Sequence, residues 1–94
     1  MTLARNLSTF ADNLSSGGAL INATEVATVS ATAATGTINF DVKTQSVLYY
    51  TTNASGNWTV NFRGSSGTSL NTLMSTGESM SVTFMVTQGS TAYY

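Results

Sequence analysis

The hydrophobic positions follow two different periods, and the chain changes from one to the other after a pair of glycines. Four apolar side chains near the start are spaced four, three and four residues apart: Leu3, Leu7, Phe10 and Leu14. This spacing places them on one stripe of an amphipathic helix, which we call the N-terminal stripe. The same spacing is an a/d seam, although two heptads are too few to establish a coiled coil. Gly17 and Gly18 end the predicted helix.

A helix of this length is marginal in isolation, so we expect the N-terminal stripe to be buried against something. Two partners are open at this point: the rest of its own domain, or another chain.

From residue 36 onward, apolar and polar side chains alternate, which is the period of a half-buried β-strand. The alternation or a short apolar run predicts five strands: residues 37–43, 47–52, 58–63, 80–87 and 91–94. In the fourth of these, four side chains are expected to point inward: Met80, Val82, Phe84 and Val86. The side chains between and after them, Ser81, Thr83, Met85 and Thr87, are expected to point outward. Residues 19–35, rich in Ala and Thr, fit either one or two weak strands or an extended linker. Ser69 is expected to cap one helical turn that follows it.

The segments 47–52 and 58–63 are joined by five residues that include Gly56, which is a hairpin signature. A hairpin would bring roughly half of the local aromatic rings into a core. Strand alternation separates Tyr49 from Tyr50, so one of these rings should point outward. We select Tyr50 as the interface candidate.

These elements predict an all-β fold, either an antiparallel β-sandwich or a small jelly-roll-like barrel, preceded by the short N-terminal amphipathic helix. Residues 1–18 would form a helical docking or oligomerisation segment, and residues 19–94 the β-sandwich domain. The last predicted strand stops on two tyrosines without a closing turn. We therefore expect the β domain to continue beyond residue 94 in the full gene product.

Composition narrows the chemistry that the chain can support. Its 94 residues include no Cys and no His, which excludes disulfides and metal sites built on thiolate or imidazole. Only 7% of the residues are charged and the net charge is −1, so no basic face exists for nucleic acid. No apolar run approaches the roughly 20 residues of a membrane helix.

The few ionisable side chains give no catalytic arrangement. Four acids are spread over separate predicted elements: Asp12, Glu25, Asp41 and Glu78. Asp41 should project from its strand and pair with Lys43 or Arg63 at the surface. A serine nucleophile would have to use Lys43 as its base, without an SxxK element around it. We predict no enzyme activity, no cofactor and no metal.

Four segments carry a resemblance to a known group of proteins: INFDV, LYYT, NWTVNFRGSSGT and VTQGSTAYY. Residues 19–94 resemble a module of structural proteins of marine tailed bacteriophages, especially the tail-fibre-like proteins of cyanophages. The resemblance implies a non-enzymatic virion part assembled in several copies, and it supplies no catalytic or binding residues. The chain departs from a long fibre in being short, with its apolar stripe at the N-terminus. This departure leaves a connector, a collar piece or a capsid decoration open.

The functional expectation is a virion structural protein of a tail fibre or appendage, docked on other virion proteins through the N-terminal stripe. We expect a homo-oligomer, with a trimer as the favoured state. One alternative is a capsid decoration or cement protein. Another is a module that binds host surface glycans through an exposed Tyr50 or Trp58.

Overall fold

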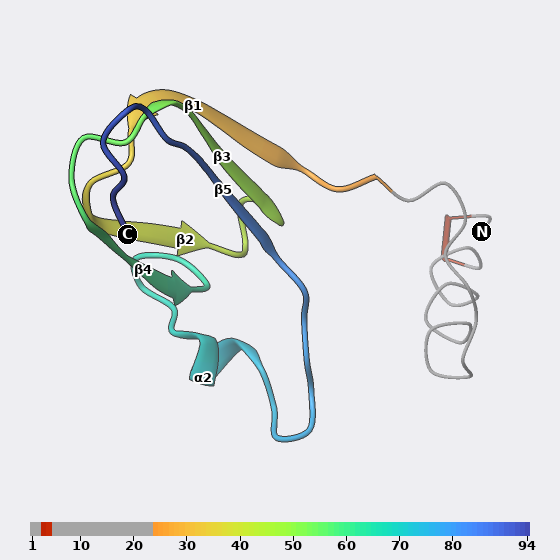
Figure 1. Cartoon of the computed structure of the whole chain (residues 1–94). Helices are drawn as coiled ribbons and strands as arrows, with labels where there is room; N and C mark the ends of the chain where they lie inside the picture. Colours follow the sequence, from red (N-terminus) through yellow and green to blue (C-terminus); the bar gives the residue numbers. More distant parts are fainter. Residues whose placement is uncertain (1–2, 5–23) are drawn as a thin grey trace.

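The chain passes alternately through two β-sheets, and the strands within each sheet are parallel (Figure 1). The computed structural model describes residues 3–4 and 24–94. Its elements are β1 (Ala27–Ala33), β2 (Gly36–Asp41), β3 (Val47–Asn53), β4 (Trp58–Arg63), α2 (Leu70–Leu73) and β5 (Thr83–Thr87). Strands β1, β3 and β5 form sheet A, while β2 and β4 form sheet B. Each strand lies parallel to the strand one coil earlier, so residues 24–94 form a short β-solenoid.

The register gives the length of each coil. Ala27 pairs with Val47 in sheet A, and Gly36 pairs with Trp58 in sheet B, so one coil takes 20 to 22 residues. The next coil of sheet A is longer, because Val47 pairs with Thr83. The extra residues form the loop between β4 and β5 that carries α2 (Figure 1).

The β-rich class predicted from the sequence is confirmed, but the antiparallel arrangement is wrong. Every strand pair in the described residues is parallel, and the two sheets do not close into a barrel there. The predicted hairpin is also wrong, since β3 and β4 belong to different sheets. The segment between them turns a corner: the Ser55 N–H donates to the Ala34 carbonyl at 3.1 Å, and the Gly36 N–H donates to the Asn57 carbonyl at 2.9 Å. This corner therefore stacks on the corner of the preceding coil.

The strand positions were predicted more accurately than their pairing. Residues 37–43, 47–52 and 58–63 correspond to β2, β3 and β4, and the undecided segment 19–35 contains β1. β5 begins only at Thr83, and Met80, which was expected to point inward, is exposed. Residues 91–94 form no strand, although the Tyr94 carbonyl accepts a hydrogen bond from the Trp58 N–H at 3.2 Å.

The predicted helical turn is confirmed as α2. The Ser69 hydroxyl accepts a hydrogen bond from the Thr72 N–H at 3.2 Å, which satisfies one of the free donors at the helix start.

The core lies between the inward faces of the two sheets. Its buried side chains come from both sheets and from two corners: Ala34, Ile38, Phe40, Leu48 and Ala54. Half-buried side chains pack around them, among them Tyr50, Trp58, Val82, Phe84 and Val86. The Phe40 and Phe62 rings on neighbouring strands pack against each other at a tilt of 36°, with centroids 5.4 Å apart. The inward direction predicted for Val82, Phe84 and Val86 is confirmed.

Gly36 occupies the first corner in a conformation that disfavours other residues, since its φ is 63°. A Cβ at Gly36 or at Gly67 would meet no atom within 4 Å. Of these two glycines, Gly36 alone has a positive φ. We expect Gly36→Ala to lower the free energy of unfolding by about 1–2 kcal/mol, the cost of left-handed backbone for an L-residue. Gly67→Ala is the matched control and should be neutral or slightly stabilising. Urea unfolding measures both, and equal effects would contradict the conformational explanation.

The N-terminal helix lies mostly outside the described residues. The Leu3 side chain is 73% exposed. Leu7, Phe10 and Leu14 lie outside the described residues, so their common stripe stays a prediction, as does the division of the chain at residue 18.

Candidate functional site

The aromatic rings considered for ligand binding mostly face the core. The Tyr50 and Phe84 rings meet edge to face with centroids 6.0 Å apart, and the Trp58 and Phe84 rings are 6.4 Å apart. Tyr50 has the same inward direction as Leu48, two residues earlier on β3. The outward ring of the tyrosine pair is therefore that of Tyr49. Tyr50 was selected for an interface on the assumption of an outward ring, and the structure corrects that orientation.

The outer face of sheet B is polar and internally paired. Equivalent residues of β2 and β4 lie side by side, as Thr37 with Thr59, Asn39 with Asn61, and Asp41 with Arg63. The Asn61 side-chain amide donates to Asn39 Oδ1 at 3.0 Å.

Arg63 completes this polar face and confirms one of the two pairings expected for Asp41. Its Nε lies 2.5 Å from Asp41 Oδ1, and its Nη2 lies 3.4 Å from Oδ2. The hydrogen bond to Asp41 raises the pKa of the Arg63 guanidinium, with a further Coulombic contribution that partial desolvation opposes. The only guanidinium among the described residues is thus already engaged by a carboxylate.

The outer face of sheet A has the opposite character. None of the residues of β1, β3 and β5 is charged. The register places Val29 beside Tyr49 and Tyr49 beside Met85, and we call these three residues the apolar row. Val29 is 63% exposed and Met85 is 41% exposed. Tyr49, between them, is half-buried. A row of apolar side chains that crosses a whole sheet and is exposed at both ends is a candidate contact surface.

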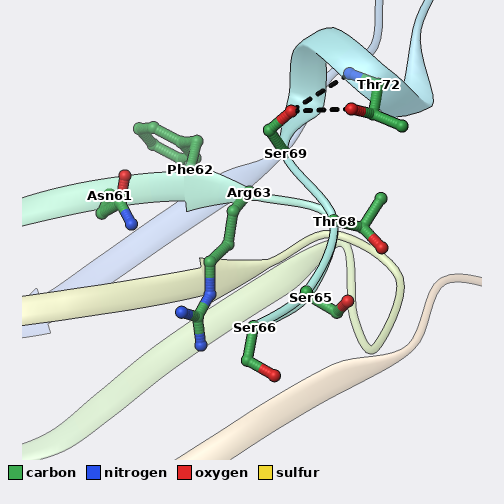
Figure 2. A pocket seen from close by; sticks show the side chains of 9 residues that line it. Asn61, Phe62, Arg63, Ser65, Ser66, Thr68, Ser69 and Thr72 are labelled. Carbon is green, nitrogen blue, oxygen red and sulfur yellow. Dashed lines mark hydrogen bonds between the residues drawn. The ribbon is translucent and has the colours of Figure 1, made fainter.

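A shallow depression of about 520 Å³ lies beside the end of β4 and the start of α2 (Figure 2). Its lining is mainly amide and hydroxyl groups, together with Arg63. The Ser69 and Thr72 hydroxyls lie 3.0 Å apart and serve the helix cap. Since Arg63 is paired with Asp41, the depression offers neither an activated nucleophile nor a free cation.

Glu78 makes a hydrogen bond within its own loop. Glu78 Oε1 accepts a hydrogen bond from the Ser75 N–H at 2.6 Å, next to Gly77 with its φ of 89°. Residues 64–67 form part of a tight turn closed by the bridge between Ser65 and Thr68. Across residues 24–94, no three acidic side chains are grouped as a metal site would require. No helix in the described part is long and apolar enough to span a bilayer.

Sequence reasoning identified one member of the apolar row and missed two. Met85 was expected to point outward, and this is confirmed. Val29 lies in residues 19–35, which the sequence leaves open between strand and linker. Alternation alone does not show which of Tyr49 and Tyr50 points outward, and Tyr50 was the interface candidate. Only the parallel register brings the three together, so alternation within each strand could not reveal the row.

No family model matches the chain, and no significant match to it is found among curated proteins or solved structures. The resemblance to bacteriophage structural modules therefore stays a prediction.

Proposed function

We propose that the chain is a structural subunit of a bacteriophage virion, assembled in several copies in a tail fibre or appendage. The observation that carries the assembly role is the outer face of sheet A, which has no charged residue and exposes the apolar row. The assignment to a virion rests on the sequence resemblance of residues 19–94.

The solenoid geometry suits a mechanically rigid part of an assembly. Each coil packs mainly on its neighbours, so rigidity builds up along the stack without a large central core. The surface is nearly neutral, with 7% charged residues in the whole chain, and such a surface repels neighbouring protein only weakly. An exposed apolar row on that surface favours permanent contacts with other subunits over an isolated monomer.

A capsid decoration protein would show the same features, and the position of the chain in the particle distinguishes the two roles. Immunogold labelling of purified particles should mark the tail or an appendage. Labelling over the capsid surface would replace the fibre assignment with the decoration role.

The host-glycan alternative required a solvent-facing ring at Tyr50 or Trp58. Both rings pack against the core cluster, so no observation favours that function.

Docking through the N-terminal stripe gives the proposal its main test. In the full chain, Leu7→Asp together with Phe10→Asp places two charges on the stripe and should abolish incorporation into particles. Mass spectrometry of purified virions measures incorporation, and circular dichroism checks that the β-solenoid still folds. Wild-type chain should be abundant in the same particles.

Ser8→Asp with Thr9→Asp is the matched control, because these positions lie on the opposite side of the predicted helix. The control adds the same charge and should leave incorporation intact. Normal incorporation of the Leu7/Phe10 variant would refute docking through the stripe, and absence of the wild-type chain from particles would refute the virion role.

A further inference from the structure

We infer that the N-terminal stripe of one copy packs on the apolar row of a neighbouring copy. The inference rests on the proposed function and deepens it, because it names the surface that receives the stripe. One chain would then carry both halves of its own assembly contact.

The acceptor surface has the size of one helix. The apolar row crosses the three strands of sheet A, and a spacing of about 4.8 Å between strands makes it about 10 Å wide, close to the diameter of a helix. The outer face of sheet A continues along the strands on both sides of the row, and strands of five to seven residues make it about 17–23 Å long. A helix over residues 3–14 would be about 18 Å long.

The two surfaces also match in chemistry. The strands of sheet A contribute no charge, and the side chains of the N-terminal stripe are all apolar. The polar face of sheet B offers no such match, because its Asn39, Asn61, Asp41 and Arg63 side chains already bond to one another. Burying an apolar stripe there would separate an ion pair or leave amides without partners.

The position of the N-terminal segment favours sheet A as its target. The described β domain begins at Thr24, three residues before β1, and β1 is an edge strand of sheet A. Leu3, the first side chain of the stripe, is 73% exposed in the single chain. A neighbouring copy would cover both Leu3 and the apolar row.

The symmetry of such a contact follows from its two different halves. Each copy presents one stripe and one row, so the contact is heterologous and closes as a ring when the rotation allows. A ring of three copies would agree with the trimer expected from the sequence.

Cysteine cross-linking tests the inference directly, because the chain contains no Cys of its own. A chain carrying Leu7→Cys is mixed with a mass-tagged chain carrying Met85→Cys, and a short bismaleimide is added. We expect a cross-linked pair containing one chain of each mass. The control replaces Met85→Cys by Thr59→Cys, on the polar face of sheet B, and should give several-fold less of the mixed product.

Two results would overturn the inference. The first is a mixed product no more abundant than with Thr59→Cys. The second is a monomer cross-linked within itself when one chain carries both Leu7→Cys and Met85→Cys, with no product between chains. Should cross-linking fail while Leu7→Asp/Phe10→Asp is still excluded from virions, the stripe docks on another virion protein and only the inference falls. Should cross-linking succeed while the chain is absent from virions, only the proposed function falls.

Discussion

Replacing Phe40 by alanine is expected to lower the free energy of unfolding by about 3–5 kcal/mol, the usual cost of removing a buried ring. Phe40 has 0% exposure and is the largest fully enclosed side chain among the described residues. A domain of this size has a total stability of about 5–15 kcal/mol, so the variant should be close to unfolding at room temperature. Urea unfolding followed by the fluorescence of Trp58, the single tryptophan, measures the loss.

Phe62→Ala provides a matched control on the neighbouring strand. Phe62 pairs with Phe40 across sheet B and touches its ring, but it is 43% exposed. Its removal takes less surface out of the core and should cost clearly less than the removal of Phe40. Equal losses for the two variants would contradict the placement of Phe40 at the centre of the core.

The direction of side chains along each strand could be predicted from the sequence. Ile38 and Phe40 alternate with polar neighbours, and both are buried in the structure. Alternation is a local property of an extended backbone, so it holds whichever strands become neighbours.

The pairing of strands could not be deduced from the same signal. The four residues between β3 and β4 are enough for a hairpin loop and also for a corner between two sheets. The corner forms because its backbone groups bond to the preceding corner, as Ser55 does with Ala34. That partner lies 21 residues earlier, so the sequence of the loop alone does not identify it.

One sequence signal could have revealed the coil. TINFD at residues 37–41 and TVNFR at residues 59–63 repeat the pattern Thr, apolar, Asn, Phe, and the structure stacks them residue on residue. The two copies are 22 residues apart, and a repeat with a period of this size is typical of a solenoid. The loop that carries α2 lengthens the next coil and breaks the spacing, so the period does not recur in the last part of the chain.

The apolar row depends on that same register. Met85 could be assigned to an outer face from alternation, but its neighbours Tyr49 and Val29 follow only once β5, β3 and β1 are known to lie side by side. A contact surface built across a sheet is therefore harder to predict than one built along a single helix, such as the N-terminal stripe.

Gln45→Ala is expected to cost about 1–3 kcal/mol, because it removes a buried amide that bonds on two sides. Gln45 is 7% exposed, and its Nε2 donates to the Asp41 carbonyl at 2.7 Å. Its Oε1 accepts a hydrogen bond from the Thr28 hydroxyl at 2.8 Å. The register places Thr28 beside Leu48 on the inward face of sheet A, so the amide satisfies a polar group at the first coil of the core.

Gln88→Ala is the control, since the Gln88 amide also makes two hydrogen bonds, both to Tyr93, but lies at the surface. Water can replace its partners, and the loss in urea unfolding should be smaller.

A second pair of variants separates the contribution of the hydrogen bond between Thr28 and Gln45 from that of packing. Thr28→Val alone leaves the buried Oε1 of Gln45 without its donor, whereas in the Gln45→Leu background the same change joins two apolar side chains and should cost less. Equal costs for Thr28→Val in both backgrounds would mean that the amide and the hydroxyl are not coupled.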